Sequence, residues 1–548
     1  HFPSAPLWST FVLFQCLDAV VYPLRVPVKH FDIGIYLISC LMNFLFFAWL
    51  RSCYGLLPRR GRIVAAVAFG LLLAFLAIAN TLVYREMGDY LSLYMLMFIK
   101  ADPQYALNFA TSYLLNINLV WLLLLWGLLS AVWYPRTTKK ETLRVPVAIA
   151  GIVLLPVLYL VSLNYINIHG RQSILSTTAA TGLAIRDVAR AVPNPKKLCA
   201  ARHQQLQLLA GKERPDFNIV VIVNESWGRH GLPFYGSSDT AMPFLTDWIR
   251  SDSAGFFVFR KAYTNSSATD VSVPSLMTGV APYESSSKLH RIPFLWDWAH
   301  AAGMPTLFVT AQRYTWARLD NFFFTPGPDT YVTAETMNMP QINDTGVDEL
   351  YASDRFCREL NNLPKDRPFF AVYNSNAIHA PFQQTSAALS TQPSFSQPYY
   401  NAAWLLDRSF KHIYETLQRS GKLENTLFIF TSDHGEYLTG CRECTPRILA
   451  FNRTIMSIPF LIRTPSSWQT THPDVVAALR SNVSRPVSNI DIAPTIAALL
   501  GFLEKPDNGK IVHELAGSPL SRPLPQERLV ISLNTNDIRS WEHEGFSI

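Results

Sequence analysis

The chain has 548 residues, of which 49% are hydrophobic and only 16% are charged. This length exceeds that of one ordinary domain, and so apolar a composition is unusual for a protein that is soluble throughout. The formal net charge of +7 is modest and the basic residues are scattered, which argues against nucleic acid as a partner.

The long apolar runs lie in the first 166 residues, where a membrane-spanning helix needs roughly 20 apolar residues. Four charge-free windows approach this length, and a fifth, weaker window carries Asp18. The alternative for the weak window is a signal peptide, but it lacks a small-residue cleavage site and another span follows at once. We therefore predict five transmembrane helices, in the windows 7–22, 33–50, 63–84, 112–134 and 145–166.

Two short loops between these spans are rich in lysine and arginine, which places them in the cytoplasm. With five spans, the N-terminus is then cytoplasmic and everything after residue 166 lies outside. We expect a multi-pass membrane protein whose C-terminal part lies in a periplasmic or extracellular space. The basic loop residues are Arg51, Arg59, Arg60, Arg62, Arg136, Lys139, Lys140 and Arg144.

Four cysteines fall in the external part: Cys199, Cys357, Cys441 and Cys444. In an oxidising compartment, four thiols predict two disulfides, and Cys441 with Cys444 is the obvious pair. The alternative for this "CREC" stretch is half of a zinc site, but the chain has no second CxxC.

The external part alternates short apolar runs of buried-strand type with helical stretches. The runs cover 217–226, 305–311, 368–376 and 426–436, and an amphipathic helical pattern covers 402–421. This alternation predicts an α/β fold with a largely parallel sheet. We expect a transmembrane domain over 1–166, a bridging surface helix and linker over 167–214, and a catalytic domain over 215–548.

Polar residues follow several of these strands, where ligands bind in such sheets. Glu225 ends the first, His379 follows the third, and Asp433 with His434 ends the fourth. Helix capping would explain Asp433, but not the adjacent histidine or a glutamate preceded by apolar residues. Mixed nitrogen and oxygen donors suit Zn²⁺, with Mn²⁺ or Mg²⁺ as alternatives.

The stretch "NSSATDVSVPSLMTG" at 265–279 places several hydroxyls at the start of a helix. A hydroxyl is a weak nucleophile that metal coordination can activate, and the same ion can polarise a phosphoryl oxygen. The helix N-terminus can stabilise the incoming anion. These features favour transfer of a phosphate-bearing group.

The motifs "VIVNES", "SSATDVSVPS", "NAIHAPF", "TSDHGE" and "VSNIDIAPTIAALLG" resemble, in order and approximate spacing, those of the alkaline phosphatase and sulfatase superfamily. With five spans ahead of them, the chain resembles the membrane-bound phosphoethanolamine transferases. That resemblance implies phosphatidylethanolamine as donor and an envelope glycan or lipid, such as lipid A, as acceptor.

The resemblance also assigns roles to individual residues. It makes Glu225, Asp433 and His434 metal ligands, together with Thr269, three residues before "SVP". Thr269 would be the nucleophile that carries the covalent phosphoethanolamine, and His379 would serve the leaving group or acceptor at the substrate site. Asp491 also matches the superfamily, and we interpret it as a structural helix cap.

Two departures from the family pattern bear on the chemistry. The transferases usually have a further histidine about a dozen residues after "DHGE", and "YLTGCRECTPRIL" has none. In addition, "YTWARLDNFF" at 314–323 is similar to a Trp-x-Arg element of the lipoteichoic acid synthases, which predicts that Trp316 and Arg318 bind the headgroup phosphate. The alternative for this pair is a tryptophan packed on the surface beside a solvated arginine.

Three alternative functions remain. A phosphoglycerol transferase would use phosphatidylglycerol with the same metal and nucleophile. A sulfatase would need arginine four residues after its formylglycine precursor, but Leu276 follows Ser272 at that distance. An inactive membrane scaffold would not need the complete set of Glu225, Thr269, Asp433 and His434.

Overall fold

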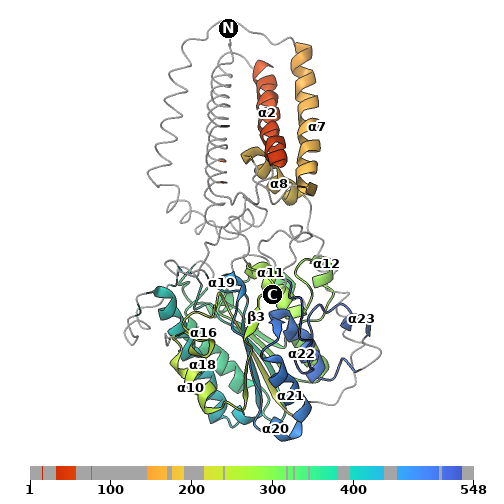
Figure 1. Cartoon of the computed structure of the whole chain (residues 1–548). Coiled ribbons are helices and arrows are strands. Elements are labelled where there is room, and N and C mark those ends of the chain that lie inside the picture. Colours follow the sequence, from red (N-terminus) through yellow and green to blue (C-terminus); the bar gives the residue numbers. More distant parts are fainter. Residues whose placement is uncertain are drawn as a thin grey trace. The chain divides into compact units, whose positions relative to one another are not determined.

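The computed structural model describes residues 33–56, 145–169, 176–189 and 215–532, with Gln15, Leu76 and Asn80. Omitted from the last range are 238–240, 285, 316–318, 325–326, 344–345, 380–381, 383–394, 396, 437, 439–452 and 505–508. The chain divides into two compact units (Figure 1). Unit 1 comprises 1–191 and 447–450, and unit 2 comprises the rest.

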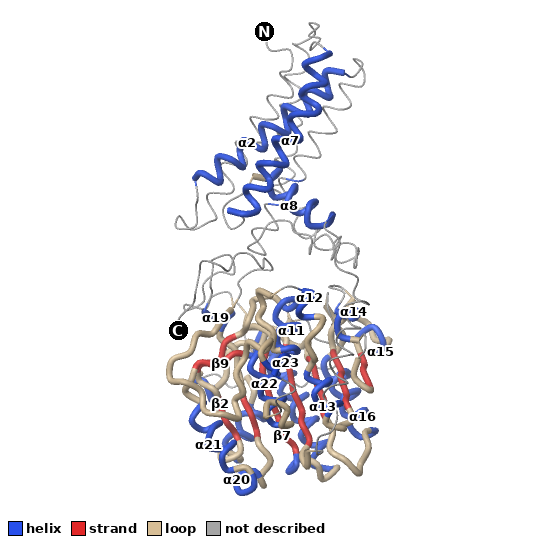
Figure 2. The backbone as a smooth tube through the Cα atoms, turned by 90° about the vertical axis from the view of Figure 1, so that its right-hand side faces the viewer, coloured by secondary structure: helices blue, strands red, loops and turns tan. Residues whose placement is uncertain are grey.

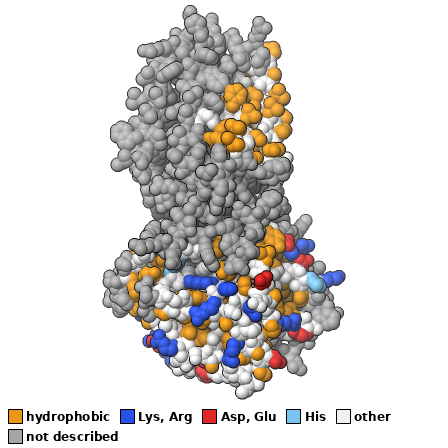
Figure 3. Space-filling view, in the orientation of Figure 1, with side chains coloured by type: hydrophobic (Ala, Val, Ile, Leu, Met, Phe, Trp, Pro, Cys, Tyr) orange, Lys and Arg blue, Asp and Glu red, His pale blue; other side chains and the backbone are white. Residues whose placement is uncertain are grey.

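The long described helices of unit 1 are α2 (Ile33–Leu56) and α7 (Val145–His169). Each contains a stretch long and apolar enough to cross a membrane, and these stretches match two of the five predicted windows. Many of their apolar side chains are exposed, as at Val153 and Val161, and form an apolar surface (Figure 3). Such a surface is expected to face lipid. The other three windows lie outside the described residues, apart from Gln15, Leu76 and Asn80, so the count of five stays a prediction.

Helix α8 (Thr177–Ala189) occupies part of the segment predicted to bridge the two domains. It is not exposed on all sides, because Ala179, Ala180 and Leu183 pack into an apolar cluster with α2 and α7. At its start, the Thr178 hydroxyl donates a 2.6 Å hydrogen bond to the side-chain oxygen of Asn43 in α2. The expected surface helix therefore has a face buried within unit 1.

Unit 2 contains a seven-stranded sheet in the order β2-β8-β7-β1-β6-β4-β5. Strands β7, β1, β6, β4 and β5 run parallel, while β8 pairs antiparallel with β7 and with β2. This confirms the prediction of a largely parallel sheet. The strands are β1 (Asn218–Asn224), β2 (Phe256–Val258), β4 (Thr306–Thr310), β5 (Thr330–Val332), β6 (Phe370–Asn374), β7 (Thr426–Ser432) and β8 (Leu461–Arg463).

Helices cover both faces of this sheet (Figure 1). Strand β1 explains why, since Val220 and Ile222 join one apolar cluster and Ile219, Val221 and Val223 join another. A strand buried on both faces is expected to be apolar at every position. One face carries α10 (Pro243–Ser251), α16 (Glu349–Asn362) and α18 (Pro398–Arg419), and the other carries α11 (Thr269–Thr278), α13 (Leu295–Ala301), α20 (Trp468–Thr471), α21 (Pro473–Asn482) and α22 (Ile492–Leu499).

A second, two-stranded sheet joins β3 (Lys261–Tyr263; labelled in Figure 1) to β9 (Pro486–Ser488; labelled in Figure 2). The two strands are parallel, with Tyr263 opposite Ser488. Strand β3 leads to the hydroxyl-rich stretch, and β9 leads to the short helix η6 (Asn489–Asp491). The remaining short elements are η4 (Pro233–Tyr235), α12 (Ser286–Leu289), α14 (Leu319–Phe323), α15 (Ala334–Met337), η5 (Leu423–Asn425), α19 (Arg453–Met456) and α23 (Gly509–Val512).

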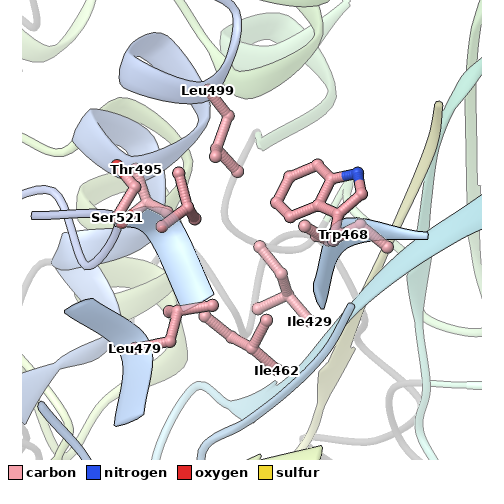
Figure 4. A pocket seen from close by; sticks show the side chains of 9 residues that line it. Ile429, Ile462, Trp468, Leu479, Thr495, Leu499 and Ser521 are labelled. Carbon is pink, nitrogen blue, oxygen red and sulfur yellow. The ribbon is translucent and has the colours of Figure 1, made fainter. Parts of the chain in front are cut away.

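A small apolar pocket lies where α20, α21 and α22 meet β7 and β8 (Figure 4). Ile429, Ile462, Trp468, Leu479 and Leu499 supply most of its wall. The lining contains no titratable side chain, so this pocket belongs to the packing of the core and not to the chemistry.

Cys357 departs from the expected disulfide pattern. It forms no disulfide and is a buried thiol in α16. The prediction that all four external cysteines pair is therefore wrong for this residue, which packs in the core as a small apolar side chain. Cys199, Cys441 and Cys444 lie outside the described residues.

Candidate metal centre

The site begins at the ends of two neighbouring parallel strands. Asn224 of β1 is directly opposite Ser432 of β7, so Glu225 and Asp433, the next residues, leave the sheet side by side. Ser226 turns the chain with a positive φ of 56°, which is uncommon for a residue other than glycine. In that conformation its amide donates to Oδ1 of Asp433 at 3.0 Å and its hydroxyl donates to Oε1 of Glu225 at 3.0 Å.

Glu225, Asp433 and His434 form one buried cluster, with a ligand atom of each within 4.8 Å of the others. The ring of His434 is oriented by its own neighbour, because Nδ1 lies 2.8 Å from the carbonyl oxygen of Gly435. A carbonyl can only accept, so Nδ1 carries the proton and Nε2 keeps its lone pair. Histidine ligands in metal sites are commonly held in this way.

The shape of the turn after His434 requires a residue without a side chain. A Cβ at Gly435 would lie 2.8 Å from the Thr454 carbonyl oxygen and 2.9 Å from that of Ile455. These contacts are too short for any real Cβ, so the glycine of "DHGE" allows the backbone that holds His434 to approach the segment around α19.

Thr269 is the first residue of α11 and points at the cluster. Its Oγ1 lies 3.2 Å and 3.3 Å from the two carboxylate oxygens of Glu225, and 3.2 Å from Nε2 of His434. The unpaired amides of the first turn of a helix favour an anion at this end. The structure thus places the predicted nucleophile, the predicted ligands and an anion-binding helix end together.

The spacing of these donors fits a single small cation. Four ligands about 2.0–2.1 Å from a tetrahedral Zn²⁺ are separated from one another by about 3.3–3.4 Å. Besides the 3.2 Å contacts of Thr269, Nε2 of His434 lies 3.5 Å from Oε1 of Glu225 and 3.5 Å from Oδ2 of Asp433. Nε2 of His434 therefore lies near ligand spacing from an oxygen of each of Glu225, Asp433 and Thr269.

Asp433 supplies a second sign that a cation belongs here. Its Oδ1 accepts hydrogen bonds from two backbone amides, but the buried Oδ2, which faces His434, has no hydrogen-bond partner. Burial and then the charge of Glu225 raise the pKa of Asp433 to about 7. An anionic oxygen without a partner in a buried site is costly unless a positive ion satisfies it.

Glu225 shifts in the opposite direction from Asp433. Burial alone would raise the pKa of Glu225, but His434, His379 and the hydrogen bond from Gln312 hold it below its usual value. Of the two carboxyls, Glu225 keeps the charge, because the hydroxyls of Ser226 and Thr269 and the side-chain amide of Gln312 all donate to it. A divalent cation would let both be ionised at once.

Gln312 is a site residue that the sequence did not reveal. It follows β4 by two residues, is buried, and donates from Nε2 to Oε2 of Glu225 at 2.7 Å. Its amide orientation follows from that contact, since the carboxylate can only accept. The strand-end rule that selected Glu225 and Asp433 could have selected Gln312 as well.

Asp270 was also missed by the sequence reasoning. It follows Thr269 in α11, and its Oδ1 is buried without a hydrogen-bond partner. Burial raises the pKa of Asp270 to about 7. A carboxyl in the first turn of a helix is usual, which is why this residue carries no distinct signal in the sequence.

The hydroxyls of Ser266 and Ser272 bond to backbone atoms and not to the ligand atoms of the cluster. Ser272 is fully buried and donates to the backbone carbonyl of Asp433 at 2.7 Å. Ser266 accepts from the Ala268 amide at 3.2 Å, and Asn265 bonds to Ser272 and to Asn489. These side chains shape the turn that presents Thr269.

His379 lies close enough to Glu225 to lower its pKa and is only partly buried. Asp491, in contrast, accepts from the Ser488 and Ser518 amides and pairs with Arg528, as expected of a structural cap. Trp316 and Arg318 lie outside the described residues, so their predicted contact with a headgroup phosphate stays a prediction.

Comparison with known proteins places this site in a family context. The sequence matches the protein-family model for sulfatases over residues 217–502, which is more than half of the chain. It is 31% identical over 146 residues to an endo-4-O-sulfatase of Bacteroides thetaiotaomicron, covering 26% of each chain. It is 38% identical over 84 residues to the uncharacterized sulfatase YidJ of Escherichia coli K12, covering 15% of this chain and 14% of that one. These alignments span about a quarter or less of the curated relatives.

A solved structure is similar over nearly the whole chain. It is the integral membrane protein lipooligosaccharide phosphoethanolamine transferase A from Neisseria meningitidis, with a TM-score of 0.62 and 15% sequence identity. The alignment covers 91% of this chain and 95% of that one. At this identity the likeness establishes a common fold.

Proposed function

We propose that this chain, which belongs to the sulfatase family, is a metal-dependent phosphotransferase of the inner membrane. It takes phosphoethanolamine from phosphatidylethanolamine and gives it to an envelope glycan or lipid, such as lipid A. In this proposal the chain crosses the membrane several times from a cytoplasmic N-terminus, and unit 2 works in the periplasm.

One observation carries the proposal. Thr269 is the hydroxyl that faces the buried donors Glu225 and His434, at 3.2 Å from each. Ser272, at the position of a sulfatase formylglycine precursor, is instead buried and hydrogen-bonded to a backbone carbonyl. Since Leu276 also replaces the arginine of the sulfatase motif, we propose a threonine nucleophile and not a sulfatase reaction.

Glu225, Asp433, His434 and Thr269 would hold the ion, for which we propose Zn²⁺. When bound, it lowers the pKa of the threonine hydroxyl and withdraws charge from the phosphoryl oxygens. Gln312 holds the carboxylate of Glu225 at 2.7 Å, and the Gly435 carbonyl fixes the ring of His434. The amides at the start of α11 would receive the phosphoryl oxygens that gain charge as the reaction proceeds.

The reaction would proceed in two displacements. First, Thr269 Oγ1 forms a bond to phosphorus and releases its proton to water, while the bond from phosphorus to the diacylglycerol oxygen breaks. We assign to His379 the delivery of a proton to that departing oxygen. An acceptor hydroxyl or phosphate then bonds to phosphorus as the Thr269 Oγ1 bond breaks, and Thr269 regains a proton.

Donor choice separates this proposal from phosphoglycerol transfer, because both phospholipids present the same phosphodiester to the same residues. Full-length protein in nanodiscs is given either phosphatidylethanolamine or phosphatidylglycerol with a labelled headgroup, and the Thr269→Ala variant serves as control. Label on the protein from phosphatidylethanolamine alone supports the proposal. Label from phosphatidylglycerol alone would show that phosphatidylglycerol is the donor. Label retained by Thr269→Ala would overturn the assigned nucleophile.

A further inference from the structure

Asn489 joins the two segments of the site that are far apart in the sequence. It is the first residue of η6 and is fully buried. Strand β9 ends at Ser488, opposite Tyr263 of β3, so Asn489 emerges beside the start of the stretch that leads to Thr269. The two-stranded sheet thus places the Asn489 carboxamide next to the backbone that carries the candidate metal ligands.

The donor half of this carboxamide contacts the strand that carries two metal-ligand candidates. Nδ2 donates to the backbone carbonyl oxygens of Ser432 and Asp433, at 3.1 Å each. The carbonyl of Asp433 also accepts from the hydroxyls of Thr264 and Ser272. Side-chain donors from three residues therefore hold the backbone carbonyl of Asp433, the residue whose carboxylate is a candidate metal ligand.

The acceptor half contacts the segment that presents the nucleophile. Oδ1 of Asn489 accepts from the Asn265 amide at 2.9 Å and from Asn265 Nδ2 at 2.8 Å. Backbone amides only donate and carbonyls only accept, so the partners fix the orientation of the Asn489 amide without ambiguity. A residue of the same shape with two acceptors cannot satisfy this arrangement.

We propose that Asn489 is a positioning residue that fastens the turn preceding Thr269 to the end of β7, and so sets the distance between the nucleophile and the metal ligands. The inference rests on the proposed function. Groups of this kind behind a metal site change metal affinity or activity by about 10–100-fold when removed. A misplacement of about 1 Å at a reacting group can cost about 100-fold in rate.

A matched control exists in the same domain. Asn482, at the end of α21, is also fully buried, donates from Nδ2 to the carbonyls of Leu520 and Arg522 at 3.0 Å and 2.8 Å, and accepts from the Leu524 amide at 2.9 Å. Like Asn489, it donates to two backbone carbonyls and accepts from a backbone amide. Among the described residues it lacks a side-chain amide donor such as Asn265, and none of these partners is a residue of the site. Variants of Asn482 thus measure the general effect of losing a buried side-chain amide, separately from any effect on the site.

The test compares Asn489→Ala and Asn489→Asp with Asn482→Ala and Asn482→Asp in the full-length, detergent-solubilised protein. Zn²⁺ affinity is measured by competition with a chromogenic chelator, and headgroup release by kcat and KM. We expect both Asn489 variants to bind Zn²⁺ about 10–100-fold more weakly and to lose kcat with little change in KM. The Asn482 variants should match the wild type in both quantities, whatever their melting temperature.

Unchanged Zn²⁺ affinity and kcat in the Asn489 variants would overturn the inference while leaving the proposed function intact. Equal losses in the two asparagine series would overturn it too, because the effect would then be general. If the wild type bound no metal, the proposed function would fail, and hydrogen exchange would decide the inference alone. Faster exchange of 264–272 and 432–434 in Asn489→Ala, but not in Asn482→Ala, supports the fastening role, and unaltered exchange refutes it.

Discussion

Oγ1 of Thr269 lies 3.2 Å from Nε2 of His434, while Nδ1 of the same ring lies 2.8 Å from the Gly435 carbonyl. The proton on Nδ1 leaves the Nε2 lone pair directed at the site of the threonine. A metal ion bound by Nε2 would therefore lie beside the hydroxyl that it has to activate. This relationship distinguishes Thr269 from Ser266 and Ser272, whose hydroxyls bond to backbone atoms, and leads to the predictions below.

The nucleophile itself gives the first prediction. Thr269→Ala should lower headgroup transfer by at least about 1,000-fold, because the lost hydroxyl is the one that lies 3.2 Å from both Glu225 and His434. Ser272→Ala should keep the nucleophile and lose far less. Transfer from labelled phosphatidylethanolamine in nanodiscs measures both, and a Ser272→Ala variant as inactive as Thr269→Ala would contradict the assignment.

The buried carboxylates of the site give the second prediction. Glu225→Gln and Asp433→Asn should each weaken Zn²⁺ binding by more than about 100-fold, since a ligand of the ion is lost and not only an outer partner. Asp407→Asn is the matched control, because Asp407 is also buried but binds the Phe244 and Leu245 amides. Chelator competition checks the affinities, and a loss of the same size in Asp407→Asn would count against the metal assignment.

Gln312 gives a prediction about pH. Gln312→Leu removes the donor that holds the Glu225 carboxylate at 2.7 Å, so the pKa of Glu225 should rise. Zn²⁺ binding requires the deprotonated carboxylate, and its pH midpoint should therefore move upward, with affinity at neutral pH lower by about 10–100-fold.

Gln469→Leu is the control for that experiment, since Gln469 donates only to the Ala254 carbonyl at 2.9 Å, outside the site. Zn²⁺ titrations at a series of pH values measure the midpoint for each protein. An unmoved midpoint in Gln312→Leu would show that the contact with Glu225 does not tune metal binding.

A buried glutamate outside the metal site predicts how stability depends on pH. Glu349 accepts from the Tyr373 hydroxyl at 2.6 Å and from the Asn376 amide at 2.9 Å, and burial raises its pKa to about 7. A folded-state pKa above the unfolded value means that stability present at low pH is lost as pH rises through about 7.

Between acidic and mildly alkaline pH, the unfolding free energy of the wild type should therefore fall by on the order of 3 kcal/mol relative to that of Glu349→Gln. Urea unfolding followed by tryptophan fluorescence measures this difference. The unfolding free energy of Glu415→Gln, a change on the exposed side of α18, should depend on pH as that of the wild type does. Parallel curves for Glu349→Gln would mean that Glu349 is ionised in the fold without cost.

Much of unit 2 follows from local sequence. The runs at 217–226, 305–311, 368–376 and 426–436 contain β1, β4, β6 and β7, because a strand buried on both faces has to be apolar almost throughout. Once β1 and β7 are neighbours in a parallel sheet, Glu225 and Asp433 meet without further information. The strand-end chemistry was therefore predictable from the sequence.

The contacts behind the site were not predictable in the same way. Asn489 reaches Asn265 and Asp433 through β3 and β9, which are only three residues long each and have no distinctive apolar pattern. Cys357 was misassigned because its pairing was inferred from compartment alone, whereas its place in α16 is set by packing. Such contacts depend on tertiary structure that a single sequence does not specify.

The most direct test of the central claim is mass spectrometry of the purified full-length protein after incubation with phosphatidylethanolamine. We expect a covalent phosphoethanolamine on the peptide containing Thr269, lost in Thr269→Ala and removed when an acceptor is added. Turnover of the donor with an unmodified Thr269 peptide, or the adduct on another residue, would contradict the account.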